Sequence, residues 1–205
     1  MVVLAIIVTI TSVVLTSQSS FNKTLVVANT AYDIALSLRS AATYGLGGHA
    51  ISMLPTGYGM HFERSTPGSF TLFADTYPAP SASSVCHSAT DPSTLDAQPG
   101  NCSYDSEQDL TVTRYTLGNN IVISDFCAFS SGAWSCADAL GGTLTALDIV
   151  FARPDSDPFM SINRSYSAIS PVTTSCLKVS SPLGGDRFVS VSVSGRITAN
   201  ASSCP

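Results

Sequence analysis

The chain has 205 residues, of which 44% are hydrophobic and only 11% charged, and its formal net charge is −5. Nine lysines and arginines are too few for a basic nucleic-acid-binding surface, so we expect no nucleic-acid partner. Much of the remaining polarity comes from Ser and Thr, which suits an extracellular β-rich domain better than a cytosolic enzyme. Beyond an N-terminal helix, about 160 residues are left, enough for one domain with its own core.

The chain begins with a stretch that predicts one continuous helix, Met1–Tyr44, with no Pro or Gly before Gly45. Its first part, Met1–Leu15, is almost wholly apolar and uncharged, and so requires a non-aqueous environment on every side. Its second part has apolar residues at steps of three and four: Val27, Ala31, Ile34, Leu38 and Ala42. We expect the following residues to act in membrane insertion or assembly: Val2, Val3, Leu4, Ile6, Ile7, Ile10, Val13, Val14 and Leu15.

Three interpretations of Met1–Leu15 are open. A secretory signal peptide would fit the small polar run Thr16–Ser20 as a cleavage region, but no basic region comes before the apolar run. A buried core helix would need burial all round. A helix that faces membrane and partner chains is the interpretation that we favour. As a helix, Met1–Leu15 rises only about 22 Å, against about 30 Å for a bilayer core, so we expect it to lack its first turns.

The run VVLAIIVTITSVVL followed by FNKTLVVANTAYDIALSLRSAATYG closely resembles the N-terminal helix of type IV pilins and pseudopilins. Tyr58–Phe62 and Phe70–Asp75 look like the first head strands of the H-type pseudopilin group, and Val189–Ile197 looks like its closing strand. The resemblance places Met1 several residues inside the family's mature helix. It implies a chain truncated before the leader, the Gly-Phe cleavage point and the acidic residue of that family.

Six cysteines lie in the part of the chain after the helix, and none forms a CxxC pair. Zinc or thioredoxin-type chemistry is therefore poorly supported, whereas an even count fits disulfides in an oxidising compartment. Fifteen pairings are possible in principle. Because loop closure costs less over short separations, we predict pairing in local order. The predicted bridges are Cys86–Cys102, Cys127–Cys136 and Cys176–Cys204.

In the part of the chain after the helix, here called the head, alternating apolar segments between turn residues predict four hairpins. The paired segments are Tyr58–Phe62 with Ser69–Asp75, Leu110–Thr116 with Asn120–Ser124, Thr143–Phe151 with Phe159–Tyr166, and Ser175–Val179 with Arg187–Thr198. We expect an irregular loop over Tyr77–Gly100 and a disulfide-closed loop over Phe126–Gly142. Alternation in the last segment predicts core positions for Val189, Val191 and Val193.

These elements predict an α+β fold, in which an antiparallel β-sheet head packs on the C-terminal half of a long N-terminal helix. The resemblance implies the same arrangement, a type IV pilin-like fold. We expect the chain to divide into two parts. Residues 1–20 form the hydrophobic membrane or filament-core half of the helix. Residues 21–205 form the globular head together with the amphipathic half of the helix.

No catalytic constellation is evident. The three histidines, His49, His61 and His87, form no HExxH motif or close pair, and there is no GxSxG elbow or P-loop. We therefore expect no enzyme activity, no catalytic residue, no cofactor and no small-molecule substrate. A calcium site at Asp155 and Asp157 is left open. A cation-binding loop is also left open in the acidic segment between Arg64 and Arg114, which contains Asp91, Asp96, Asp105, Glu107 and Asp109. In both places a solvated turn or loop is the simpler interpretation.

Loop aromatics leave one further alternative open. Tyr77, Phe126, Phe129 and Trp134 could form an exposed adhesive patch, although we favour a role in covering the core.

The resemblance implies a structural subunit, a minor pilin or pseudopilin of a type IV pilus or type II secretion-like bacterial filament. Its expected partners are other subunits, bound through the N-terminal helix, and the inner membrane before assembly. Its expected location is single-pass in the inner membrane with the head outside, then a periplasmic or extracellular filament. The alternative is a secreted or tethered adhesive binding module with a removed signal peptide, whose mature chain would begin near Ser17–Phe21.

Overall fold

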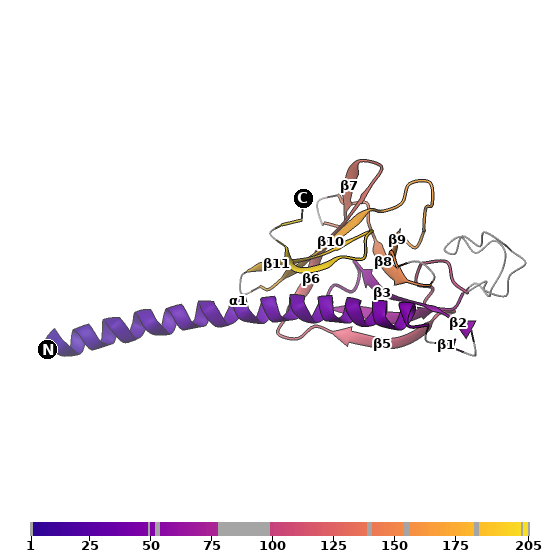
Figure 1. Ribbon diagram of the computed structural model, residues 1–205. Coiled ribbons are helices and arrows are strands. Elements are labelled where there is room, and N and C mark those ends of the chain that lie inside the picture. Colours follow the sequence, from indigo (N-terminus) through magenta and orange to yellow (C-terminus); the bar gives the residue numbers. More distant parts are fainter. Residues whose placement is uncertain are drawn as a thin grey trace, which may run out of the picture.

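The computed structural model describes residues 2–48, 50–51, 54–77, 99–138, 141–153, 156–182, 185–201 and 203–204. The first element, α1, spans Val2–Leu46. Figure 1 shows its N-terminal part extending beyond the head and its C-terminal part lying along the strands. Gly47 and Gly48 follow the helix, and Gly48 has a positive φ of 66°, a common way to end a helix.

A five-stranded antiparallel sheet, here called the β3 sheet, has the order β5-β4-β3-β8-β9. Its strands are β3 Gly57–Glu63, β4 Ser69–Asp75, β5 Leu110–Thr116, β8 Ala146–Phe151 and β9 Phe159–Ile162. The central strands, β3, β4 and β8, are buried along nearly their whole length. Both faces of the sheet are therefore covered at these central strands, whereas the edge strand β5 is largely exposed.

A second five-stranded antiparallel sheet, here called the β10 sheet, has the order β12-β11-β10-β6-β7. Its strands are β6 Val122–Ser130, β7 Ala133–Cys136, β10 Thr174–Ser180, β11 Asp186–Ser192 and β12 Ile197–Ala201. A short pair, β1 Ala50–Ile51 with β2 Leu54–Pro55, follows the helix.

The C-terminal part of α1 packs against both sheets. Its buried face belongs to one hydrophobic core with the inward side chains of β3, β4 and β8 and those of β6, β10 and β11. Ile34 and Leu38 are fully buried in this core. Close approach is possible at the end of the helix because Gly45 has no side chain. A Cβ added there would lie 2.0 Å from the carbonyl oxygen of Phe151.

The predicted fold class is wrong. The protein is mostly β, with two five-stranded sheets where one sheet was expected, and only the short helical part from Thr24 to Leu46 accompanies them. The reason is visible at Leu117–Ile121, where the chain leaves one sheet and enters the other. The predicted hairpin of Leu110–Thr116 with Asn120–Ser124 therefore does not form. β5 pairs with β4, whereas β6 pairs with β7 and β10.

Three other predicted hairpins are confirmed by the strand pairs β3–β4, β8–β9 and β10–β11. The predicted loop Phe126–Gly142 instead contains the β6–β7 hairpin. The predicted final strand is divided, because β11 ends at Ser192 and a turn precedes β12. Val189 and Val191 are buried as predicted, but Val193 falls in that turn and is 40% exposed.

Candidate assembly site

The N-terminal part of α1 exposes large apolar side chains in every direction. Seven of them are between 51% and 74% exposed: Val2, Val3, Leu4, Ile6, Ile7, Val8 and Ile10. Consecutive helical residues are 100° apart around the axis, so this run leaves no polar face. Soluble proteins rarely leave a continuous apolar surface of this kind uncovered, so this segment is a candidate interaction site. Six of the nine residues predicted for assembly are among these seven.

The hydroxyl groups within this segment do not make it polar. The Oγ1 of Thr9 donates to the carbonyl oxygen of Ile6 at 2.9 Å, and that of Thr11 donates to Ile7 at 2.7 Å. Hydroxyls bonded back to the helix in this way need no partner from solvent. The surface can therefore enter an apolar environment without leaving these donors unsatisfied.

Three predicted assembly residues, Val13, Val14 and Leu15, belong to α1, but their side chains lie outside the described residues. Within the described part of the chain, no helix has both the length and the apolarity that crossing a membrane requires. The predicted single-pass span in the inner membrane thus has no support there.

The outer face of α1 over the head carries further apolar residues. Leu25, Tyr32 and Leu36 are 44%, 53% and 60% exposed, at spacings of seven and four residues. They lie opposite the buried stripe of Val27 and Ile34. An exposed apolar row thus follows the same helix that carries the N-terminal apolar segment, and it leads to a groove beside β5.

Disulfides fasten the β10 sheet. Cys127 and Cys136 face each other across β6 and β7, and their sulfurs are bonded. Cys176 on β10 is bonded to Cys204 near the C-terminal end. These are two of the three pairs expected from sequence order. Cys102 is also disulfide-bonded, while its expected partner, Cys86, lies outside the described residues. Such bridges stabilise a domain by about 2–4 kcal/mol each.

The acidic groups near β4 are held by backbone donors. The two carboxylate oxygens of Asp75 accept from the backbone N–H groups of Asn101 and Cys102, at 3.1 and 2.7 Å. Asp109 accepts from the backbone N–H groups of Thr76, Tyr77 and Asp105. N–H donors aimed at these two carboxylates occupy positions that a cation would take, so the cation-binding alternative gains no support from Asp75 or Asp109. Asp91 and Asp96 lie outside the described residues.

Burial changes the titration of both carboxyls. Burial, and secondarily the nearby Asp109 carboxylate, raise the pKa of Asp75 well above its ordinary value. Burial likewise raises the pKa of Asp109 to about 6, although its backbone hydrogen bonds oppose the shift.

Of the two residues proposed for a calcium site, Asp157 is exposed in a bend, and Asp155 lies outside the described residues.

His61 is the histidine whose placement is described, and His49 and His87 lie outside the described residues. Its Nδ1 lies 2.6 Å from Oδ1 of Asp148, and both side chains are buried. The ring packs against Tyr104, with centroids 4.7 Å apart. Burial raises the pKa of Asp148, and the hydrogen bond with His61 lowers it. No nucleophile is bonded to this pair among the described residues, so the arrangement is that of a buried hydrogen-bonded pair.

One group of possible metal ligands, Asp125, Cys127 and Cys136, lies together on the β10 sheet. Both sulfurs are consumed by their mutual bond, so neither is a thiolate that could bind a metal.

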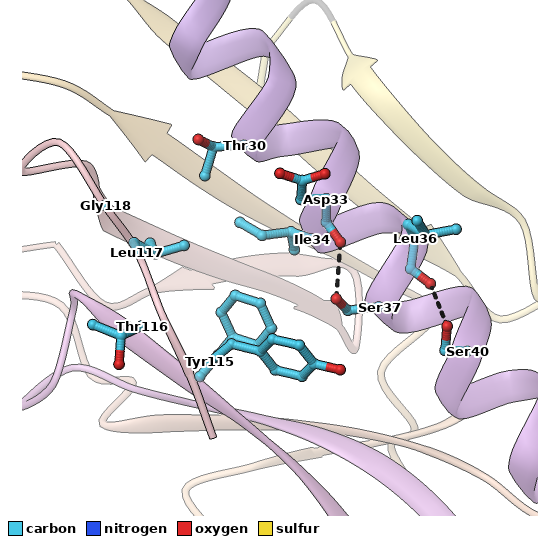
Figure 2. Close-up of a pocket in the computed structure, with 11 residues that line it drawn as sticks. Thr30, Asp33, Ile34, Leu36, Ser37, Ser40, Tyr115, Thr116, Leu117 and Gly118 are labelled. Atoms are coloured by element: carbon cyan, nitrogen blue, oxygen red, sulfur yellow. Dashed lines mark hydrogen bonds between the residues drawn. The ribbon is translucent and has the colours of Figure 1, made fainter. Parts of the chain in front are cut away.

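The loop aromatics do not form one exposed patch. Phe126 is buried in the core, Phe129 packs on Trp134 at 5.2 Å, and Tyr77 lies apart at the end of β4 with 43% exposure. Sequence reasoning missed the groove between α1 and β5 (Figure 2). One signal was available in the sequence. Leu36 is apolar but does not belong to the predicted buried series of the helix, so it indicates an exposed apolar surface on α1.

Comparisons of the chain with protein-family models, with curated proteins and with solved structures found no match.

Proposed function

We propose that this chain is a structural subunit, a minor pilin or pseudopilin of a type IV pilus or type II secretion-like filament. In this proposal it assembles through the apolar N-terminal part of α1. The observation that supports the proposal is the all-round exposure of apolar side chains from Val2 to Ile10. The two-sheet head differs from the fold expected by resemblance, so the proposal rests on the helix alone.

The geometry favours an assembly of several copies over a pair. Burying seven half-exposed aliphatic side chains yields on the order of 10 kcal/mol at most. Association costs about 4–15 kcal/mol, so a helix must bury most of this surface for the contact to be stable. One neighbour covers only one side of a helix. A bundle in which each apolar helix is surrounded by others covers all sides, which is the core arrangement of a filament.

The disulfides fit a head that works in an oxidising compartment, such as the periplasm or the outside of the cell. Other copies of the subunit, or related subunits, are the proposed partners of the helix. Contact with the inner membrane before assembly stays a prediction.

A matched pair of charge substitutions tests the proposal. Ile7→Glu places a carboxylate in the apolar segment, where Ile7 is 59% exposed. Ile169→Glu makes the same change at a head position that is 97% exposed. In the source organism we expect Ile7→Glu to abolish recovery of the subunit in sheared, sedimented filaments, because burying an unpaired carboxylate costs several kcal/mol. Ile169→Glu should leave recovery unchanged.

Equal recovery of the two variants would contradict assembly through the helix. N-terminal sequencing of the exported protein separates the alternative function. A mature chain that begins near Ser17–Phe21 would show that the apolar segment is removed, and would favour a secreted binding module.

A further inference from the structure

Two disulfides lie side by side in the β10 sheet, and the register of three strands aligns them. Cys136 on β7 is directly opposite Cys127 on β6, and Cys127 is directly opposite Cys176 on β10. Cys176 is bonded to Cys204, which follows β12, the edge strand on the far side of the sheet from β7. Each bridge therefore fastens one edge of the sheet to an inner strand.

A third bond, between Cys127 and Cys176, would fit the same register. Residues directly opposite each other in an antiparallel pair have side chains on one face and Cα atoms about 4.5 or 5.5 Å apart. A disulfide needs Cα atoms about 4.4–6.8 Å apart. The two inner cysteines therefore satisfy this requirement without movement of β6 or β10.

The order of the strands also suits exchange between the two bridges. In thiol–disulfide exchange, a thiolate attacks one sulfur of a disulfide and the other sulfur leaves. β6 lies between β10 and β7, so a thiolate at Cys176 would approach Cys127 from the side opposite to its bonded partner, Cys136. An in-line displacement requires this arrangement.

Exposure decides which sulfurs a thiol from solvent can reach. Cys127 and Cys176 are each 2% exposed, whereas Cys136 and Cys204 are partly exposed. A carboxylate oxygen of Asp125 lies within 4.8 Å of the Cys136 sulfur, and its charge disfavours the approach of a thiolate there. A thiol from solvent therefore enters most readily at Cys204, and the buried Cys176 is then the leaving group.

We propose that these four cysteines form a redox switch that a dithiol opens at Cys204. A thiolate of the dithiol attacks Cys204, and Cys176 leaves as a thiolate. The second thiol then releases Cys204, so the dithiol becomes a disulfide and supplies the two electrons. The Cys176 thiolate attacks Cys127, the Cys127–Cys176 bond forms, and Cys136 leaves and takes a proton from water. This second step involves no net oxidation or reduction.

The exchange changes which strands are fastened. The original bridges hold the edge strands β7 and β12, whereas the new bond joins two inner strands, β6 and β10, and releases both edges. Burial disfavours a thiolate, so transfer of the free sulfur from the buried Cys176 to the partly exposed Cys136 favours the second step. The switch does not depend on assembly through the helix.

Partial reduction of the folded protein tests the switch. The full-length chain in detergent is treated with limiting dithiothreitol and quenched in acid, where thiolates are scarce. Free thiols are alkylated, and the bridges are mapped by mass spectrometry after digestion with pepsin. Among these four cysteines, we expect label on Cys136 and Cys204 and a link between Cys127 and Cys176. Label on an original pair, either Cys176 with Cys204 or Cys127 with Cys136, would overturn the switch.

Two matched variants approach the same bond from opposite sides. Cys204→Ser leaves Cys176 without its partner, and Cys136→Ser leaves Cys127 without its partner. Both variants should contain the Cys127–Cys176 bond, with the free thiol at Cys136 in the first and at Cys204 in the second. Hydrogen exchange at β6 and β10 shows that each variant is folded. An original bridge retained in either folded variant, with the free thiol on Cys176 or Cys127, would overturn the exchange.

Discussion

Two carboxyl groups buried near the end of β4 make the stability of this protein depend on pH. The pKa of Asp109 is raised to about 6, and that of Asp75 is raised well above its ordinary value, in both cases chiefly by burial. A carboxyl whose pKa is higher in the folded chain than in the unfolded chain binds more protons when folded. Its contribution to stability is therefore fully present below the ordinary pKa of about 4 and is lost as pH rises through the folded value.

We predict that the melting temperature falls as pH rises from 5 to 7. Asp109→Asn keeps an acceptor for the N–H groups of Thr76 and Tyr77 but removes the titration, so the fall should be smaller in this variant. Thermal denaturation followed by circular dichroism at several pH values measures the effect. The control is Asp186→Asn, because the Ser180 hydroxyl lowers the pKa of Asp186 and this group titrates below the range. A wild-type melting temperature that rises from pH 5 to 7 would contradict the prediction.

Histidine placement was predictable only in part. The predicted segment Tyr58–Phe62 placed His61 on a strand, and β3 confirms that position. In the fold His61 pairs with Asp148. The partner could not be predicted, because 87 residues separate the two positions and β3 meets β8 only in the folded sheet. The same holds for Asp75, whose backbone donors come from a loop 26 and 27 residues later.

At the scale of elements, local pairing was predictable and sheet membership was not. Short turns bring Tyr58–Phe62 and Ser69–Asp75 together, and the alternation in each segment fixes which face is buried. The connection Leu117–Ile121 is also short and contains Gly118, a common turn signal. Nothing in those residues distinguishes a hairpin turn from a crossing between sheets. β6 is instead fixed by β10, about 50 residues later, through contacts that no local pattern contains.

The contact between α1 and β8 depends on a glycine. A Cβ at Gly45 would overlap the Phe151 carbonyl, and backbone on both sides leaves little room to move. We predict that Gly45→Ala lowers the free energy of unfolding by about 1–3 kcal/mol, the usual cost of overpacking. Chemical denaturation measures it. Gly68→Ala is the control, since no atom lies within 4 Å of its Cβ position. Equal effects of the two substitutions would show that the helix end does not pack tightly on β8.

At the scale of the whole molecule, one core joins the two sheets through α1. Residues of the helix, of the β3 sheet and of the β10 sheet belong to one buried cluster. The amphipathic spacing of Val27, Ala31, Ile34 and Leu38 predicted the buried face of the helix correctly, because helix periodicity is a local property. That this face lies against two sheets was not predictable, since the pattern of a helix does not specify what it packs against.

We predict that Leu38→Ala destabilises both sheets together, by about 2–5 kcal/mol. Leu38 is fully buried, whereas Leu36 is 60% exposed on the same helix, so Leu36→Ala should have little effect. Hydrogen exchange at β3 and β10 in the full-length protein reports on the two sheets separately. Faster exchange in only one sheet would mean that the core is not shared.

The exposed apolar side chains in the N-terminal part of α1 offer a surface through which copies of this chain could bind one another. Cross-linking tests this contact directly. A photoreactive phenylalanine analogue at Ile6 lies in the middle of the apolar segment, and the same analogue at Ile169 samples an exposed position on the head. Irradiation of intact cells that produce the full-length protein should yield an adduct from position 6. Its mass should be twice the subunit mass if the neighbour is a second copy, or the sum of the two masses if the neighbour is another filament subunit. No protein adduct from position 6, or one no more abundant than from position 169, would contradict assembly through the helix.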